Sequence, residues 1–560
     1  MSDAAAPTPT PTDPPRGAWR LPAILVLALA LRAWQLQGQS LTSDEIIEAS
    51  IARCSVEEIV AYPDGFPPLY HLLLAAWTRV SPAPETGRWL SVALGVAAVY
   101  AIYRWARDAV GPTAGAAAGL LLAVSPLHVF FSQELRAYSL YLCLAAFALS
   151  FFFEALRTDS SRSWLAFLGA ATLAVYTHYY SALLAALLGV VLLCYRRHWR
   201  ELRTGLAAFV ALGVASIPAL ILLRSDVAYQ ADGFAMKAPL LATLGHTAYG
   251  FFAGFSLGPS LSELHTLPMR ESLRAAAPWA AAIAPAALWL LWQGGRRLRA
   301  TRYGAAIVLL ALGSAPAIGV AGQLAGVGPK ARYWSWILMP VIVWLAAAME
   351  GGARRRGWAI TWVALAVLIG VQAVALAQRY DSPRYANEDI RSVVAFIQQS
   401  STPQAPVFVV ADYLAPVARY YFNGEPTLHK WLPFLPSSRS TIGRGGHVPR
   451  AVAAPQINEK FSQGGYGTRS VPAPAWVVHP RTEADVRGSV PFDDEGTIAW
   501  LATVAELAGD DGRFWLLYSR PFHGDRDGRL LNHLQSTGAV QLERRFPGVE
   551  LYRGRLPTRH

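Results

Sequence analysis

The stretch TAGAAAGLLLAVSPLHVFFSQELRAYSLYLCLAAFALSFFFEAL, residues 113–156, decides the fold class. Two long apolar runs, 113–131 and 135–156, flank the short polar sequence SQE. A helix of about 20 residues rises about 30 Å, which is the thickness of the hydrocarbon core of a bilayer. Outward from this stretch the same pattern recurs, so the sequence predicts a polytopic α-helical membrane protein with eleven spans. The predicted spans are 21–34, 90–105, 113–131, 135–156, 164–176, 182–195, 206–223, 278–292, 305–324, 333–349 and 358–377.

The composition agrees with this fold class. Of the 560 residues 53% are hydrophobic and only 15% are charged, and the mean hydropathy is +0.29. Soluble domains carry about 25% charged residues. The three cysteines, Cys54, Cys143 and Cys194, are an odd number without a paired motif, which argues against a disulfide scaffold, a CxxC metal site and redox chemistry.

The distribution of arginine predicts the orientation. There are 49 Lys and Arg against 37 Asp and Glu, a net charge of +12. With the N-terminus inside, every second loop is rich in arginine, which is the positive-inside pattern. The excess of positive charge is therefore explained by the membrane topology, and no nucleic acid partner is needed to account for it. The arginines in these loops are Arg104, Arg107, Arg157, Arg162, Arg196, Arg197, Arg200, Arg203, Arg296, Arg297, Arg299, Arg302, Arg354, Arg355 and Arg356.

The domain organisation follows from this topology. Residues 1–18 are expected to form a disordered cytoplasmic tail, and the apolar run after it is an uncleaved signal anchor. Residues 19–378 are expected to form a transmembrane domain, whose first outer loop, 36–87, contains the apolar segment 67–80. That segment is too short to span and is predicted as an interfacial helix outside the membrane. In residues 379–560 the strand-like sequences APVFVVAD, AWVVHP and RFWLLYSRP alternate with helical sequence, which predicts an extracytoplasmic α/β domain.

The unusual charged residues gather at the outer ends of the spans, and ionisable groups in a membrane protein usually mark function. The first loop holds Asp44 and Glu45 in LTSDEIIEASIAR, where Ser43 is expected to cap a helix. Asp44 at such a helix start suits a general base or a ligand of a divalent cation. A solvated helix turn is the structural alternative.

Further polar residues follow on the same face. DGFPPLYH contains Asp64 and His71, and SQELRAYSLY contains Glu134, Arg136 and Tyr138. YTHYYS places His178 between two spans, and GVGPKARYW places Lys330 and Arg332 at an outer span entrance. Two cations at this position suit a phosphate group, which arginine binds in bidentate geometry. Polar turns, interfacial anchors and snorkelling side chains are the structural alternatives.

Carboxylates that activate an acceptor beside cations that bind phosphate predict group transfer at the outer membrane surface. Nucleotide-activated donors are scarce outside the cytoplasm, so the expected donor is an activated lipid phosphate. Two other classes stay open at this point. A lipid or solute transporter or flippase would not depend on Asp44 chemistry, and a scaffold subunit of the cell envelope would act through residues after 379.

The ordered set of motifs resembles the GT-C superfamily of membrane glycosyltransferases, and in particular the family 39 group of protein O-mannosyltransferases and bacterial aminoarabinose transferases. The resemblance covers most of 21–377. It rests on Asp44-Glu45 and on four motifs, PPLYH at 67–71, SQELRAY at 132–138, THYYS at 177–181 and KARYW at 330–334.

The resemblance implies an inverting transfer of a hexose or pentose from a polyprenyl-phosphate sugar to an unknown acceptor, by an integral protein of the bacterial cytoplasmic membrane. Asp44 matches the catalytic base and Glu45 and Glu134 support it. The phosphate and the rest of the substrate are expected to contact six residues, Arg136, Lys330, Arg332, Tyr138, His71 and His178.

Metal dependence stays open, because it varies across the superfamily. Some relatives have an acidic and a basic residue before the paired prolines, where this chain has Gly65 and Phe66. If Mg²⁺ or Mn²⁺ binds, Asp44, Asp64 and His178 are the candidate ligands, although such sites usually need more oxygens. The segment HGDRDG, with Asp525 and Asp527, resembles a DxD metal motif, but a glycine-bounded surface turn is the favoured interpretation.

Overall fold

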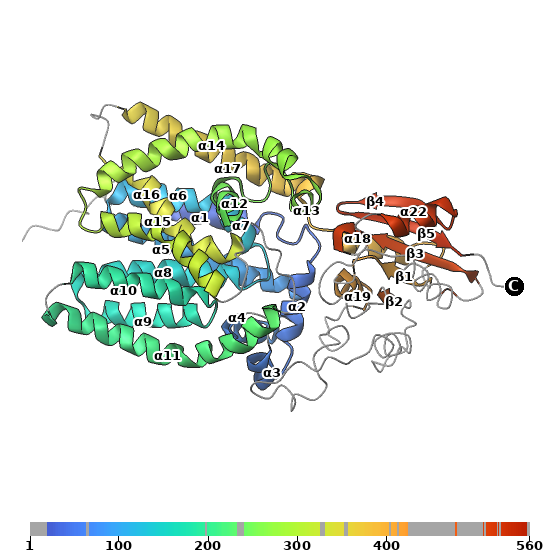
Figure 1. Cartoon of the computed structure of the whole chain (residues 1–560), viewed down its shortest axis with the longest axis horizontal. Helices are drawn as coiled ribbons and strands as arrows, with labels where there is room; N and C mark the ends of the chain where they lie inside the picture. The colour runs from blue at the N-terminus through green and yellow to red at the C-terminus, as the bar shows by residue number, and fades with distance from the viewer. Residues whose placement is uncertain are drawn as a thin grey trace, which may run out of the picture.

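The computed structural model describes residues 19–62, 66–196, 199–231, 240–324, 331–351, 357–402, 405–411, 414–423, 476–478, 508, 511–523, 525 and 528–556. A helical bundle forms one end of the molecule, and a smaller unit with a β-sheet lies beyond it (Figure 1). The predicted N-terminal tail, Asp64, Lys330 and Asp527 lie outside the described residues.

The bundle is built from helices that cover all eleven predicted spans. Its helices are α1 (Arg20–Ala33), α5 (Arg88–Ala109), α6 (Pro112–Ala123), α7 (Pro126–Ser132), α8 (Tyr138–Thr158), α9 (Ser161–Val175), α10 (Tyr180–Tyr195), α11 (Trp199–Ala231), α12 (Leu240–Ala253), α13 (Glu263–Thr266), α14 (Met269–Leu298), α15 (Gly304–Leu324), η2 (Ala331–Ile337) with α16 (Leu338–Ala347), and α17 (Trp358–Asp381).

Five of the described helices are long and apolar enough to cross a membrane, and α6 with α7 makes a sixth if this bent pair is one span. The span predicted over 113–131 consists of two helices, because the chain bends by 61° between α6 and α7. Pro126, whose ring fixes φ and removes a donor, begins the second helix, and the side chain of Ser125 caps it. Helix α12 was not predicted from the sequence.

The first outer loop folds into three short helices at the end of the bundle nearest the sheet (Figure 1). These are α2 (Ser43–Ile51), α3 (Val56–Ala61) and α4 (Leu69–Thr78). Helix α4 has 10 residues, which is too short to span a membrane, as predicted for this segment. Helix α8 begins beside these helices and has 21 residues, so its C-terminal end, which carries Arg157, lies about 30 Å away.

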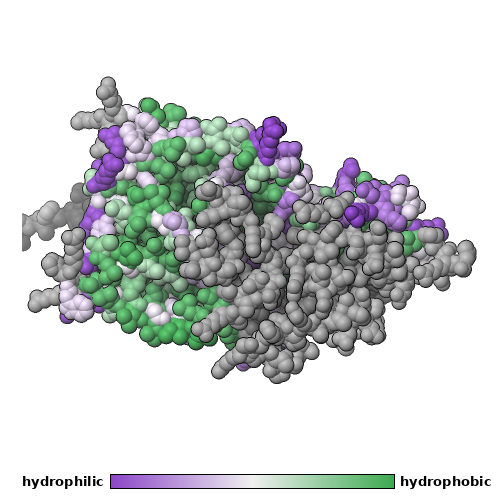
Figure 2. All heavy atoms as spheres, in the orientation of Figure 1, coloured by the Kyte–Doolittle hydropathy of each residue, from purple (hydrophilic) through white to green (hydrophobic). Residues whose placement is uncertain are grey.

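Apolar side chains cover the visible flank of the bundle, whereas hydrophilic residues gather at its far end and on the sheet unit (Figure 2). This pattern suits a bundle whose sides face lipid. Inside, the bundle packs densely around large side chains such as Trp105, Phe152 and Trp336, each at most 1% exposed. Helices α5 and α8 pack against each other in this core.

The C-terminal unit contains a five-stranded mixed sheet in the order β2-β1-β3-β5-β4. Strands β2, β1 and β3 are parallel, and β5 pairs antiparallel with β3 and β4. The strands predicted from APVFVVAD, AWVVHP and RFWLLYSRP are confirmed as β1, β2 and β3. The bounds are β1 (Val407–Val409), β2 (Trp476–Val478), β3 (Arg513–Tyr518), β4 (Val540–Phe546), β5 (Val549–Arg555), α18 (Ile390–Gln398), α19 (Ala415–Asn423) and α22 (Arg529–Ser536).

Both faces of the sheet are covered. Val407 and Val409 point into a core with α18 and α19, and Phe408 and Val410 point into a second core with α22. This alternation is the period of a strand, so a short run of apolar residues serves both faces. The first core also contains Leu41 and Ile46 of the first outer loop, which ties the bundle to this unit.

Candidate active site

Helix α2 presents the acidic pair. The side chain of Thr42 accepts a hydrogen bond from the Glu45 amide, and the Glu45 carboxylate accepts one from the Thr42 amide. This reciprocal capping box fixes where the helix begins. The prediction that Ser43 caps the helix is therefore wrong by one residue, because Ser43 is already its first helical residue.

Asp44 lies between two arginines from distant parts of the chain. Its Oδ2 is 3.6 Å from Nη2 of Arg136 and 3.6 Å from Nη1 of Arg332. The Asp44 side chain is 49% exposed, whereas that of Arg136 is 7% exposed and that of Arg332 is 35% exposed. Asp44 and Arg332 thus reach solvent side by side, and a ligand can contact both.

Glu48 lies one helical turn after Asp44 and is completely buried. Its Oε1 is 3.0 Å from Nη1 of Arg136, and its Oε2 is 2.7 Å from Nε2 of His71 on α4. Buried charges are tolerated when they are paired and bonded. Arg136 therefore binds Glu48 through Nη1 while its Nη2 faces Asp44. Through His71, Glu48 also links α2 to α4.

Aromatic rings form the wall behind the two arginines. The Arg136 guanidinium lies over the rings of Phe66 and Tyr138, at 5.3 and 5.8 Å from their centroids. The Arg332 guanidinium lies over Tyr138 and Tyr333, at 5.8 and 5.7 Å. Such cation–π contacts orient a guanidinium without using its donors. The Arg332 donors therefore stay available for an anion that competes with Asp44.

His178 belongs to this wall. Its ring is stacked on Tyr141 at a centroid distance of 4.4 Å and packs edge-on against Phe66 and Tyr333. Burial, with the charge of Arg332, lowers the pKa of His178 to about 3. The imidazole is therefore neutral at physiological pH and adds no charge to the site.

Glu45 lies on the inner side of α2 and is completely buried. Both of its oxygens accept hydrogen bonds from Arg88 of α5, at 2.7 and 2.8 Å, and Oε1 also accepts from the Leu135 amide. Burial favours the neutral form, but the Arg88 charge and these donors together lower the pKa of Glu45 below its usual value. Glu45 is thus an ionised anchor between α2, α5 and the start of α8.

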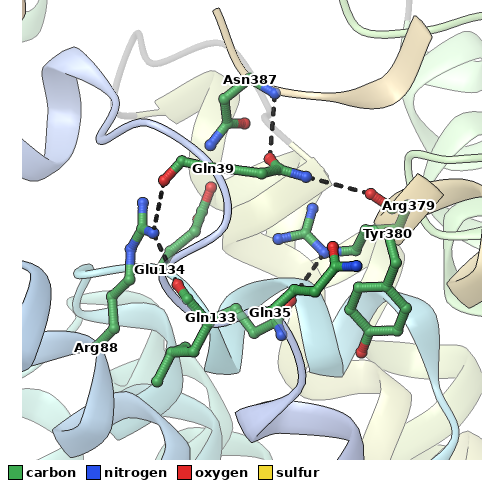
Figure 3. Close-up of a pocket in the computed structure, with 9 residues that line it drawn as sticks. Gln35, Gln39, Arg88, Gln133, Glu134, Arg379, Tyr380 and Asn387 are labelled. Carbon is green, nitrogen blue, oxygen red and sulfur yellow. Dashed lines mark hydrogen bonds between the residues drawn. The ribbon is translucent and has the colours of Figure 1, made fainter. Parts of the chain in front are cut away.

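Glu134 lines a neighbouring polar pocket (Figure 3). Arg88 and Arg379 lie on either side of this pocket. The Gln39 side chain donates a hydrogen bond to the Arg379 backbone carbonyl, and the Arg379 guanidinium donates one to the Gln133 side chain. Burial and the nearby charge of Glu45 raise the pKa of Glu134 to about 8. Glu134 lines this pocket, whereas Asp44 pairs with Arg136 and Arg332 and Glu45 pairs with Arg88, so the three predicted carboxylates have different environments.

The structure brings together five of the predicted residues, namely Asp44, Arg136, Arg332, Tyr138 and His178, and links His71 to them through Glu48. Sequence reasoning did not select Glu48 and Arg88. The spacing of Glu48, four residues after Asp44, was the available signal, because it places both carboxylates near one face of a helix. Arg88 gave no comparable signal, since it lies at the start of an ordinary span.

No group of three potential metal ligands occurs among the residues that the structure describes. Of the candidate set, Asp64 lies outside those residues and His178 is enclosed by aromatic rings. Asp525 of the DxD-like segment accepts hydrogen bonds from the Leu530 and Leu531 amides and from the Tyr518 hydroxyl. These bonds give Asp525 a structural role at the start of α22.

Comparison with known proteins gives one match to a protein family. Residues 66–221 match the family of dolichyl-phosphate-mannose-protein mannosyltransferases. This segment includes PPLYH, SQELRAY and THYYS, so the resemblance predicted from those motifs is confirmed over this part of the chain. No protein of curated function matches the sequence.

The structure is similar to solved membrane glycosyltransferases at low identity. ArnT from Cupriavidus metallidurans bound to undecaprenyl phosphate is 15% identical, with 96% of this chain and 98% of that chain covered and a TM-score of 0.49. The oligosaccharyltransferase AglB from Archaeoglobus fulgidus, in complex with an inhibitory peptide and a dolichol phosphate, is 13% identical, with 72% and 64% covered and a TM-score of 0.47. Arabinofuranosyltransferase AftD from Mycobacteria is 13% identical, with 96% and 41% covered and a TM-score of 0.43.

Proposed function

We propose that the protein is an inverting glycosyltransferase that moves a sugar from a polyprenyl-phosphate donor to an extracytoplasmic acceptor. The carrying observation is Asp44, a half-exposed carboxylate that is 3.6 Å from each of two arginines. The match of residues 66–221 to a family named for a lipid-phosphate sugar donor supports the same donor class.

In the proposed reaction Asp44 removes the proton from an acceptor hydroxyl. The acceptor oxygen attacks the anomeric carbon, the bond from that carbon to the phosphate oxygen breaks, and the polyprenyl phosphate leaves with the electron pair. A single displacement of this kind inverts the anomeric centre. Arg332 and Arg136 stabilise the negative charge that develops on the leaving phosphate, which is where fixed cations contribute most to the rate.

The other predicted residues take supporting roles in this proposal. Glu45 pairs with Arg88 and holds α2 in place, and Glu134 acts from the neighbouring pocket that it lines. Tyr138, His178 and His71 shape the wall behind the phosphate. Lys330, which precedes Arg332 by two residues in the sequence, is proposed as a further cation for the phosphate.

We place the site on the outer face of a bacterial cytoplasmic membrane, with the N-terminus in the cytoplasm and the C-terminal unit outside. The end of α8 that carries Arg157 lies about 30 Å from the Asp44 cluster, which supports this orientation. The proposal leaves the sugar, hexose or pentose, and the acceptor, protein, lipid or polysaccharide, to the experiment.

The test is transfer of radiolabelled sugar from a panel of polyprenyl-phosphate sugars by the purified protein, with membrane extract as the acceptor source. Asp44→Asn removes the base, and we expect it to leave only residual transfer. Glu57→Gln is the matched control, because Glu57 is an exposed carboxylate in the same loop. A chelator arm tests for a divalent cation. Equal transfer by wild type and Asp44→Asn would contradict the assignment of the base.

A further inference from the structure

Residues 36–46, which lead into α2 and carry Asp44, are bonded to the bundle and to the C-terminal unit at once. On the bundle side, Arg88 donates hydrogen bonds to the backbone carbonyls of Leu36, Gln39 and Ser40 at 2.9–3.2 Å. The same guanidinium binds the Glu45 carboxylate. One buried arginine thus fixes one side of this segment.

The C-terminal unit binds the other side. The Leu41 amide donates a hydrogen bond of 2.7 Å to the Tyr421 hydroxyl of α19. Arg391 of α18 donates to the carbonyls of Gln37 and Gly38, at 3.0 and 2.7 Å. These contacts join positions about 350 residues apart in the sequence.

Apolar packing reinforces these bonds. Leu41 and Ile46 are 1% and 0% exposed, and they lie in the same core as Val393 of α18 and Trp515 of β3. Ile46 follows Asp44 by two residues, which is about 200° around a helix. The C-terminal unit therefore packs against one face of α2, while Asp44 projects from the other face toward Arg136 and Arg332.

We infer that the C-terminal unit is part of the active site, with Tyr421 and Arg391 as positioning residues that hold Asp44 against Arg136 and Arg332. This inference rests on the proposed function. Asp44 is half exposed and its ion pairs with Arg136 and Arg332 are both 3.6 Å long, so the position of its carboxylate depends on how firmly the backbone of α2 is held. Displacement of a reacting group by about 1 Å can cost a hundredfold in rate.

The test compares Tyr421→Phe with Tyr518→Phe in the full-length protein. Tyr518 belongs to the same unit, and its hydroxyl binds Asp525 rather than the first outer loop. Loss of one hydrogen bond corresponds to about a fivefold change in an equilibrium constant or a rate constant. We therefore expect the single-turnover rate of Tyr421→Phe to fall about fivefold, with the donor KM unchanged. In the Asp44→Asn background, Tyr421→Phe should reduce residual transfer no further, because it acts through Asp44. Arg391→Gln should behave like Tyr421→Phe.

Hydrogen exchange gives a measurement that does not depend on activity. Peptides that cover residues 36–46 should exchange faster in Tyr421→Phe and at the wild-type rate in Tyr518→Phe. Faster exchange with an unchanged turnover rate would overturn the inference, as would equal effects of the two variants on turnover. Absence of transfer by the wild type with every donor would contradict the proposed function, whereas unchanged exchange would contradict the contact itself.

Discussion

Replacement of Arg332 by glutamine tests the phosphate assignment most directly. Its guanidinium lies over two tyrosine rings and reaches Asp44 with one nitrogen, and the side chain is 35% exposed. Arg332→Gln removes the charge but keeps a polar side chain of moderate length. We expect the fold to persist and the rate of transfer to fall sharply, because the leaving phosphate loses its more accessible cation.

The expected loss of rate in Arg332→Gln follows from the charge of the guanidinium and the exposure of its side chain. Two unit charges about 4 Å apart interact by about 4 kcal/mol at an effective dielectric constant of about 20. Solvent screens part of this at a side chain one-third exposed, so we take about 3 kcal/mol, which is about a hundredfold in rate. This lies within the range of about 10²–10³ for removal of one donor to a developing oxyanion. Arg332→Lys keeps the charge but not the bidentate geometry, so a loss of about tenfold is expected.

The assay is single-turnover transfer with the donor identified for the wild type, so that product release does not mask the chemical step. Arg384→Gln is the control, because Arg384 is also a partly exposed arginine that is paired with a carboxylate, Glu263. We expect this control to stay within about twofold of the wild type. If Arg332→Gln keeps more than half of the wild-type rate, Arg332 does not stabilise the leaving phosphate.

Three further predictions concern stability and pH. Glu48→Gln leaves the buried Arg136 without its closest carboxylate, so it should lower the free energy of unfolding by about 3 kcal/mol, measured by thermal denaturation in detergent; an unchanged midpoint would contradict the pairing. The pKa of Glu134 is raised to about 8 in the folded protein, so the folded state binds this proton more tightly than the unfolded state. Its contribution to stability therefore falls as pH rises from about 4.5 to 8, and Glu134→Gln should flatten the decline of the thermal midpoint over that window; parallel curves for the two proteins would refute the shift. Gly294→Ala places a methyl group of α14 against a backbone carbonyl of α16, so it should lower the thermal midpoint by several degrees. Gly370→Ala, with open space around the added methyl group, should leave the midpoint unchanged. Equal midpoints for the two variants would show that α14 and α16 can separate without cost.

The residues that converge on Asp44 illustrate how far the sequence alone could reach. Arg136, Arg332 and His178 were selected because they interrupt apolar segments at the outer ends of spans, where charge and imidazole are costly unless they are used. The arginine-rich loops assigned these ends to one face. That reasoning depends on hydropathy and loop parity, both of which are local properties of the chain.

Glu48 and Arg88 could not be identified as site residues from hydropathy and loop parity. The two residues are buried, and each is paired with groups that are 23 to 88 positions away in the sequence. Burial and pairing depend on which helices pack together, so neither can be read from local composition. The bend between α6 and α7 was missed for a related reason, because a serine and a proline within an apolar run are compatible with either a kinked span or two helices.

The sequence by itself determined that the protein is a helical membrane protein, where its apolar segments lie, which loop carries the acidic pair, and three of the five strands of the C-terminal sheet. These follow from the length and periodicity of apolar segments, which a single chain displays directly. Only the tertiary structure decided that Asp44 faces two arginines while Glu45 is buried against Arg88, and that the sheet unit holds the segment in front of Asp44. The physical reason is that adjacent residues of a helix point about 100° apart, so the fate of each side chain depends on what packs against its own face.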